Sequence, residues 1–453
     1  MAGSLELGRR EFLRLAALAG AGAALGGAAC GSDSPERTTA TTRAATKNRT
    51  LRIAQWAHFV PAYDTWFDGE YVKRWGEEND VAVTVDHISL PEVPSRAAAE
   101  AAAQRGHDIF GFLTSPAAFA DSAIDHREIV EEVEAKTGRM VPIMEGSVLD
   151  PKSRRYVGFP EFWAPNPVTY RSDLWSAAGA RPDTWDDVRA AGRRLKADGH
   201  PVGIGLSQDI DSTLSCVSLM FAYGASVQDE SAAVTINRPA TVEAVKVGVE
   251  LFQQAMTDEV LSWEPASNNR FLAGGEGSMI LNPVSALRAI EKQDPALAAR
   301  VALLPTPAGP AGRHGGTLTG IYVVWEFAQN QELARRFLVD LALAYRDAVL
   351  KSELYNLPAF PGAVDDLAQL TSSDTVAQPA DKYALLAGAS DWSAQIGHPG
   401  WANSAIDEVF NTYILPAMFS AAVRGEATPE EAVAMAEARV TPIFDKWRER
   451  GKI

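Results

Sequence analysis

Alternating and helical patterns of apolar residues begin near residue 51 and continue almost to the end of the chain. Residues 51–56 alternate apolar and polar side chains as a strand does, and residues 81–85 are rich in β-branched residues that favour strands. An alanine-rich stretch over 96–105 predicts a helix, and residues 108–112 predict a third strand. Strands that alternate with helices are typical of a parallel α/β layer.

The same pattern then repeats with different connections. Short strands are predicted at 167–171, 202–206, 278–281, 301–304 and 320–325. Helices are predicted to begin at Thr184, to span 241–256 and 332–345, and to begin again at Thr428. Thr184 with Asp187, and Thr428 with Pro429 and an acid at the third helical position, are typical helix starts. The chain is therefore predicted to hold two α/β layers.

The first 50 residues carry no such pattern. Arg9 and Arg10 precede a soft apolar run that ends at Cys30, and the pair resembles a twin-arginine export signal. Residues 27–30, GAAC, resemble a bacterial lipoprotein cleavage site, in which Cys30 takes lipid. The apolar run is shorter than the roughly 20 residues that span a bilayer. We expect a signal peptide at 1–29 and a flexible tether at 30–50, which is rich in Ser, Thr and Ala.

Composition excludes several functions. The net charge is −16, which disfavours nucleic acid and leaves membrane contact to the lipid anchor alone. If Cys30 is lipidated, Cys216 has no partner and is expected to be a small core residue. We predict no metal and no cofactor, because the seven histidines form no zinc motif. No phosphate loop or nucleophile elbow is present, so an enzyme is not expected.

Tryptophans and the residues near them point to a binding cleft. Several of the 11 tryptophans follow predicted strands or lie in loops, where rings and amides make walls for sugars. Residues 161–166, EFWAPN, place an acid, aromatic rings and an amide just before a strand that leaves one layer for the other. Ligands of open α/β sheets gather at the carboxyl ends of strands. This segment is therefore expected to lie where two lobes meet.

An ordered set of segments resembles one family. Residues 268–282, NNRFLAGGEGSMILN, resemble the pattern F-x-x-G-x-x-A-M before a short strand, with Ser278 in place of the usual alanine. Segments that resemble other parts of the same family's pattern occur in the family's order at 173–187, 320–338, 357–359 and 428–440. The family is the extracellular solute-binding proteins of sugar-type ABC importers, which are similar to the maltose-binding protein. The resemblance covers most of residues 51–447.

This resemblance implies a fold and a function. The fold class is α/β, a two-lobed periplasmic-binding-protein fold of type II, with lobes joined by crossing hinge segments. One lobe is expected at 51–165 and 324–362, and the other at 166–323 and 363–453. The implied function is capture of a sugar or sugar-like solute by hinge closure. The implied partners are the permease subunits of an importer, and the protein is expected to be a monomer outside the cytoplasm.

The expected ligand-binding residues follow from their places in this pattern. They are Trp56, His58, Tyr63, Phe112, Thr114, Glu161, Trp163, Asn166, Gln208, Asp209, Asn282, Gly320, Trp392 and Trp401. Near Ser285 the family has a stacking tryptophan that this chain lacks. Three alternatives stay open: the same fold with a polyamine or quaternary ammonium ligand, the same fold with a glycerophosphodiester, and an exported glycosidase or esterase.

Overall fold

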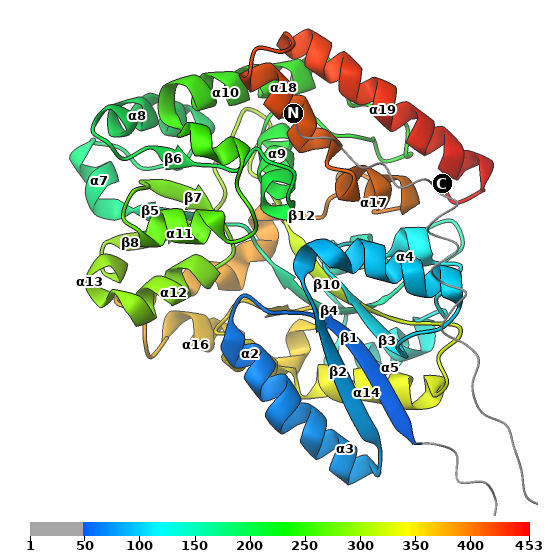
Figure 1. Ribbon diagram of the computed structural model, residues 1–453. Coiled ribbons are helices and arrows are strands. Elements are labelled where there is room, and N and C mark those ends of the chain that lie inside the picture. Colours follow the sequence, from blue (N-terminus) through cyan, green and yellow to red (C-terminus); the bar gives the residue numbers. More distant parts are fainter. Residues whose placement is uncertain (1–48) are drawn as a thin grey trace, which may run out of the picture. The chain divides into compact units, whose positions relative to one another are not determined.

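The computed structural model describes residues 49–453. The predicted signal peptide, the lipidation site at Cys30 and nearly all of the tether lie outside the described residues. Two main sheets organise the rest (Figure 1). The first sheet has the order β11-β4-β10-β3-β1-β2. Its strands are β1 (Thr50–Trp56), β2 (Ala82–Ile88), β3 (Ile109–Phe112), β4 (Phe159–Ala164), β10 (Leu318–Val324) and β11 (Leu357–Pro358).

The first three predicted strands are confirmed and form the parallel part of this sheet. β1 pairs in parallel with both β2 and β3, whereas β10 is antiparallel to β3 and β4. The helices that pack with this sheet and near it are α2 (Pro61–Trp66), α3 (Lys73–Asn79), α4 (Val93–Ala103), α5 (Arg127–Thr137), α6 (Pro142–Val148), α14 (Gln331–Leu343) and α15 (Tyr345–Lys351). Short 3-10 turns, η2 (Leu90–Glu92), η3 (Ala117–Phe119) and η5 (Pro361–Ala363), join them.

A π-helical segment, η1 (Phe67–Val72), joins α2 to α3. Trp66, Tyr71 and Trp75 are all buried, at 2%, 3% and 3% exposed. Trp66 and Tyr71 are five residues apart, a spacing that an α-helix would place on different faces. The wider π turn returns Tyr71 to the face of Trp66, so all three rings enter the core.

The second sheet has the order β6-β7-β5-β8. Its strands are β5 (Val168–Arg171), β6 (Val202–Gly203), β7 (Met279–Leu281) and β8 (Val301–Leu304). A two-stranded sheet pairs β9 (Gly315–Gly316) with β12 (Ser393–Ala394). The helices in this part are α7 (Ser172–Ala177), α8 (Trp185–Ala197), α9 (Ile210–Ala222), α10 (Pro239–Ala255), α11 (Ser267–Ala273), α12 (Ser285–Gln293) and α13 (Pro295–Ala298), with the turn η4 (Asp258–Leu261).

The last part of the chain is mostly helical. It contains α16 (Leu367–Ser372), η6 (Ala384–Trp392), α17 (Ser404–Asn411), α18 (Ile414–Val423) and α19 (Pro429–Glu449). α18 packs on α9 and α10, while α17 packs on η3 beside the first sheet (Figure 1). This part therefore bridges elements of both sheets.

Two predicted boundaries are wrong. The strand expected at 202–206 ends at Gly203, because the backbone then turns away to pair with Val260 and Ser212. The single helix expected at 332–345 is broken at Ala344 into α14 and α15. Tyr345 is 2% exposed all the same, as its position four residues after Leu341 predicts. At the end of β6 a tertiary contact overrides the local pattern.

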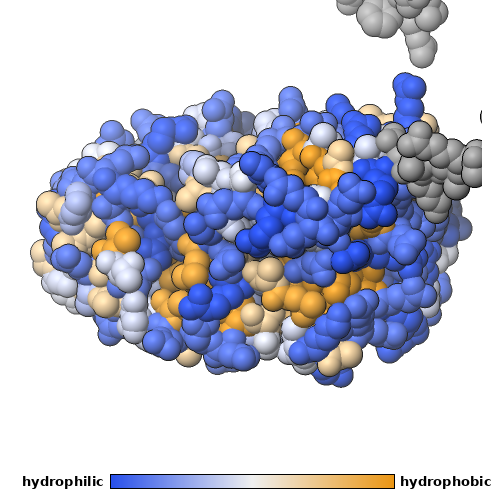
Figure 2. All heavy atoms as spheres, turned by 90° about the horizontal axis from the view of Figure 1, so that it is seen from below, coloured by the Kyte–Doolittle hydropathy of each residue, from blue (hydrophilic) through white to orange (hydrophobic). Residues whose placement is uncertain are grey.

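Local signals elsewhere are confirmed. Thr184 and Thr428 each form a complete capping box, with Asp187 and Glu431. Cys216 is 2% exposed and lies in the core as expected. The face in Figure 2 is mostly hydrophilic, with separate hydrophobic areas. Among the described residues, the large hydrophobic side chains that are exposed are Leu343, Leu350, Val376 and Met435.

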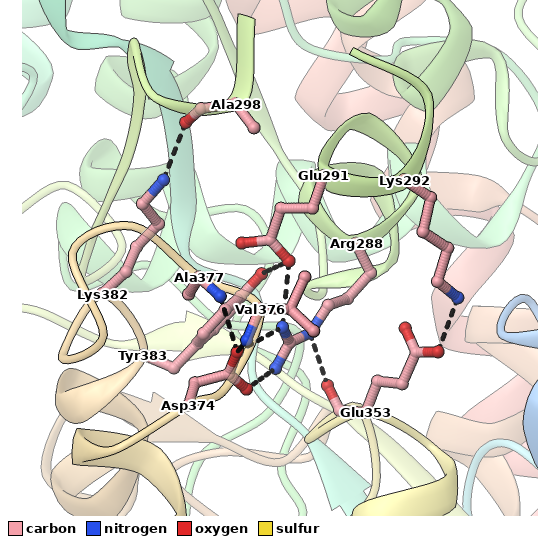
Figure 3. A network of polar contacts seen from close by, with 10 residues as sticks. All are labelled: Arg288, Glu291, Lys292, Ala298, Glu353, Asp374, Val376, Ala377, Lys382 and Tyr383. Carbon is pink, nitrogen blue, oxygen red and sulfur yellow. Dashed lines mark hydrogen bonds and ion pairs between the residues drawn. The ribbon is translucent and has the colours of Figure 1, made fainter. Parts of the chain in front are cut away.

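The chain passes between the two sheets after Ala164 and returns before Leu318. The two passing segments contact each other, because the Thr306 hydroxyl donates to the Asn166 carbonyl at 2.8 Å. A third passage follows β11 and leads to a buried ionic network (Figure 3).

Arg288 of α12 is the centre of that network. Its guanidinium makes a bidentate pair with Asp374, at 3.1 and 2.6 Å, and donates to Glu291 at 2.9 Å. It also donates to the carbonyl of Glu353 at 2.9 Å and lies 3.8 Å from the ring centroid of Tyr383 (Figure 3). The network joins α12 to the two chain segments that flank the third passage.

Candidate functional site

A cavity of about 80 Å³ lies between elements of the two sheets, and we call it the cleft cavity. Four of the predicted site residues line it. Phe112 and Thr114 come from the end of β3 in the first sheet, and Gln208 and Asp209 from the loop before α9. The structure thus brings together residues about 95 positions apart, by the numbering of the sequence. The prediction that both layers contribute side chains to one space agrees with this arrangement.

One wall of the cleft cavity is apolar. It comes from η2, the start of α4, the end of β3 and η3, and its residues are Leu90, Pro91, Val93, Pro94, Phe112, Leu113 and Phe119. The rings of Phe112 and Phe119 lie 5.4 Å apart. This wall is fixed by the first sheet, because Phe112 also contacts Phe110 inside β3, at 5.1 Å between ring centroids.

The opposite wall carries polar groups. Gln208 and Asp209 come from the loop before α9, Asn411 is the last residue of α17, and Tyr413 follows that helix. The apolar residues Ile210, Pro265 and Phe410 line the same side. Asp209 caps α9: its Oδ1 accepts from Ser212 N–H at 3.0 Å, and its Oδ2 accepts from the hydroxyls of Ser212 and Ser207. Burial, and then the charge of Asp209, raise the pKa of the Tyr413 hydroxyl. Asp209 therefore fixes the loop before α9, and the neutral side chains of Gln208, Asn411 and Tyr413 line the cavity beside it.

Asp211 is a candidate that the sequence interpretation missed. Its Oδ2 accepts from Asn268 Nδ2 at 3.1 Å, and no hydrogen bond is recorded for its Oδ1 in the described part of the chain. Burial, and then the charge of Asp209, raise its pKa to about 7. Burial, and then the charge of Asp211, raise the pKa of Tyr355, which precedes β11 of the first sheet. Asp211 itself does not line the cleft cavity.

Amide side chains of α11 and of the turn after β7 form a row of hydrogen bonds near Asp211. Asn282, a predicted site residue, donates to Asn269 and, at 3.3 Å, to Ser285. Asn269 also donates to Ser285 at 3.2 Å. The signal that identified Asn282, an amide after a short strand, is absent at Asn268 and Asn269, which lie at the start of α11.

The predicted residues of the first loop form an internal network. Trp56, His58 and Tyr63 are 3%, 5% and 2% exposed. His58 Nδ1 accepts from Val60 N–H at 2.9 Å, so its Nε2 carries the proton and donates to Asn356 Oδ1 at 3.1 Å. Burial lowers the pKa of His58 to about 4, and the ring is therefore neutral. None of the three lines the cleft cavity.

The predicted residues at the first passage between the sheets, Glu161, Trp163 and Asn166, are also buried. Tyr63 donates to Glu161 Oε1 at 2.7 Å, and Trp163 Nε1 donates to the carbonyl of Pro358 at 3.2 Å. Asn166 is 2% exposed. Gly320 pairs with Phe162 across β10 and β4, and a Cβ there would lie 2.0 Å from that ring. The structure places these residues in packing roles outside the cleft cavity.

The remaining two predicted tryptophans lie elsewhere. Trp392 is 7% exposed at the end of η6. Trp401 lines a separate cavity of about 400 Å³, with residues 150–153, 230–232 and 451–453 among its neighbours. The structure therefore does not bring either ring to Phe112 and Gln208.

Glu161 gives a prediction that separates a packing role from a binding role. Burial raises its pKa from 4.5 to about 7. The folded state therefore holds a proton that the unfolded state releases between those pH values, so stability falls as pH rises from about 4.5 to 7, by about 3 kcal/mol. We expect Glu161→Gln to reduce this slope in urea unfolding, while Asp211 and Asp407, whose pKa burial also raises to about 7, keep their part of it. The exposed Glu132→Gln is the control, and identical slopes for Glu161→Gln and wild type would contradict the assignment.

No group of three or more His, Cys, Asp and Glu side chains suited to a metal ion occurs within residues 49–453. In the same range, no helix is long and apolar enough to cross a membrane.

Comparison with known proteins identifies the family. The model of the bacterial extracellular solute-binding protein family matches residues 60–344. The chain belongs to this family. Its members are binding proteins rather than enzymes by description and fold.

Solved structures of solute-binding proteins share the fold. Maltose-bound MalE3 of T. maritima superimposes with a TM-score of 0.73 at 19% identity, covering 86% of this chain and 99% of that one. A sugar transporter protein of Arthrobacter chlorophenolicus with bound laminaribiose gives 0.74 at 15% identity, covering 87% and 99%. A ribitol complex from Agrobacterium radiobacter gives 0.71 at 16% identity, covering 87% and 98%. The predicted two-lobed type II fold is confirmed.

A curated relative of this solute-binding protein is the probable ABC transporter-binding protein of Deinococcus radiodurans. It is 25% identical over 186 residues, which cover 39% of this chain. The match spans 43% of that relative's length. With the two-lobed fold established, we call the part built on the first sheet the first lobe and the part built on the second sheet the second lobe.

Proposed function

We propose that this protein captures a sugar or polyol between its lobes and delivers it to the permease subunits of an ABC importer. One observation carries the proposal: the cleft cavity takes Phe112 and Thr114 from the first lobe and Gln208 and Asp209 from the second. The family, the importer-type relative, and the maltose, laminaribiose and ribitol bound by similar structures support it.

Hinge motion is required for this capture. Binding pockets for small molecules have volumes of about 300–1,000 Å³, whereas the cleft cavity holds about 80 Å³. A sugar must therefore enter a more open arrangement in which the lobes separate. We propose that the lobes divide at 165–167 and just before β10, where the chain passes between the sheets. The bond from Thr306 to the Asn166 carbonyl holds these passages together at the hinge.

Calorimetry of the purified protein against glucose, maltose, laminaribiose and ribitol tests the proposal. We expect at least one of these solutes, or another in an extended sugar and polyol panel, to bind with a dissociation constant in the micromolar range. A complete absence of heat across the panel would refute a sugar-binding function. Turnover of chromogenic glycosides or esters would instead favour the enzymatic alternative.

A cation is the second candidate ligand, and the acid pair carries it. Burial, and then the charge of Asp209, raise the pKa of Asp211, and a cation near both carboxyl groups would relieve their repulsion. Spermidine and choline belong in the same calorimetry panel, where binding that Asp211→Asn abolishes would favour a cation. A glycerophosphodiester has less support, since no Lys or Arg lines the cleft cavity.

Asp211 does not line the closed cleft cavity, but it lies two residues after Asp209, and we propose that a captured sugar reaches it and that binding therefore depends on pH. An ionised carboxylate accepts hydrogen bonds from sugar hydroxyls, and the pKa of Asp211 is raised to about 7. Because the ligand would select the ionised form, affinity should rise with pH and level off above 7. We expect binding at pH 6 to be about tenfold weaker than at pH 8. Asp211→Asn should bind more weakly and with little pH dependence; a retained pH dependence would place the titrating group elsewhere.

Export and anchoring complete the proposal. We propose that residues 1–29 direct export and that a lipid on Cys30 holds the protein on the outer face of the cytoplasmic membrane; the family description supports export. Mass spectrometry of the mature N-terminus should find a lipid-modified Cys30 as the first residue. A mature chain that begins elsewhere would remove the anchor and leave the binding function in place.

A further inference from the structure

The two walls of the cleft cavity differ in chemistry: the first-lobe wall is apolar except for Thr114, and most polar groups lie on the opposite wall. The first lobe presents aliphatic and phenyl groups, among them Leu90, Pro94, Phe112 and Leu113. Phe112 and Leu113 are 6% and 4% exposed, so the wall is part of the lobe's core. No tryptophan lines this cavity. A sugar with hydroxyls on every carbon would lose water at this wall and gain few hydrogen bonds in return.

The opposite wall presents uncharged polar groups next to the apolar Ile210, Pro265 and Phe410. The side chain of Gln208 is exposed and has no recorded hydrogen bond in the described part of the chain. The Tyr413 hydroxyl likewise has none there, and the Nδ2 of Asn411 is already bonded to Asp407, at 3.0 and 2.6 Å, which leaves its Oδ1. These groups can donate and accept, as the hydroxyls of one sugar ring require.

The charges of the cavity favour a neutral ligand. Among its lining residues Asp209 is the one Asp or Glu, and none is Lys, Arg or His. Both carboxylate oxygens of Asp209 are bonded to Ser207 and Ser212. An acidic ligand would find no counter-charge here. A neutral ligand with one polar and one apolar side meets both walls.

We infer that the solute is an uncharged glycoside whose sugar hydroxyls meet the polar wall and whose apolar aglycone lies against the apolar wall. This inference rests on the proposed function, because it names the class of sugar derivative that the same cleft takes. The aglycone occupies the space beside Leu90, Pro94 and Phe112 when the lobes close. Burial of a phenyl group against such a wall strengthens binding on the order of 30-fold.

Calorimetry with matched ligands tests the inference. The methyl and phenyl β-glycosides of glucose and of laminaribiose differ only in the aglycone. We expect each phenyl glycoside to bind about 30-fold more tightly than its methyl partner, with a more negative heat-capacity change. Equal affinities for the methyl and phenyl forms would overturn the inference and keep the proposed function. Binding of none of the four, together with silence across the sugar and polyol panel, would refute the proposed function itself.

Two variants test whether the preference for a phenyl aglycone arises at the apolar wall. Leu90→Asn puts an amide on the apolar wall at a half-buried position, and it should reduce the phenyl-to-methyl ratio at least fivefold. Leu350→Asn makes the same change at a 41% exposed position of α15, outside the cavity, and should leave both affinities unchanged. A phenyl preference that Leu90→Asn does not reduce would mean that the aglycone lies elsewhere, and the inference would fail.

Discussion

Replacing Arg288 with methionine is expected to lower the free energy of unfolding by about 3–5 kcal/mol. The methionine keeps much of the contact with Tyr383 but removes the guanidinium that pairs with Asp374 and Glu291 (Figure 3). Arg288 and Glu291 are 5% and 3% exposed in their side chains. Glu291 and Asp374 would remain buried without the guanidinium that pairs with them, and these unpaired charges explain the size of the effect. Urea unfolding followed by circular dichroism measures it.

Lys292→Met is the matched control. Lys292 lies on the same helix and pairs with Glu353, but its side chain is 52% exposed. An exposed pair of this kind contributes about 1 kcal/mol or less. Adding Asp374→Asn to Arg288→Met should recover part of the loss, because the second change removes the unpaired charge. Equal losses in the free energy of unfolding for Arg288→Met and Lys292→Met would show that burial does not increase the contribution of the network to stability.

Gly320→Ala is expected to destabilise the first lobe by about 3 kcal/mol. A Cβ at Gly320 would lie 2.0, 2.1 and 2.7 Å from three atoms of the Phe162 ring. That ring is 2% exposed and covers the glycine across the paired strands β4 and β10. The ring must therefore leave a packed position. Thermal and urea unfolding measure the loss, whereas the affinity for a solute should remain close to that of wild type.

Gly69→Ala is the control for this change, because no atom lies within 4 Å of a Cβ built at Gly69. It should be neutral or slightly stabilising. Combining Gly320→Ala with Phe162→Ala should cost less than the sum of the two single changes, since both act on one contact. If Gly320→Ala instead kept its stability and lost solute binding, Gly320 would act as a binding residue.

Sequence patterns predicted the fold because its signals are local. Alternation at residues 51–56 and a β-branched run at 81–85 were enough to find β1 and β2. The capping boxes at Thr184 and Thr428 are complete within four residues. The order of motifs along the chain then indicated the two-lobed arrangement. Boundaries set by distant contacts, such as the end of β6 at Gly203, were mistaken, and the strand β4 was not predicted.

The site was harder to predict because its partners are remote in sequence. His58 and Glu161 resembled binding residues, but their partners are Asn356, 298 positions away, and Tyr63, 98 positions away. Asp211 looked like one more acid on a helix until Asn268, 57 positions on, came beside it. A polar residue beside aromatic residues is the same local pattern whether the group faces a cleft or closes a core. Burial decides between them, and burial is a property of the whole fold.

Hydrogen–deuterium exchange with and without the tightest-binding solute of the calorimetry panel tests the central claim most directly. Capture between the lobes predicts that amides at 112–114 in the first lobe and at 208–210 in the second become protected together at saturating solute. The region around Trp401, which lines the separate cavity, should change little. Protection confined to one lobe, or centred on Trp401 and residues 150–153, would contradict the account.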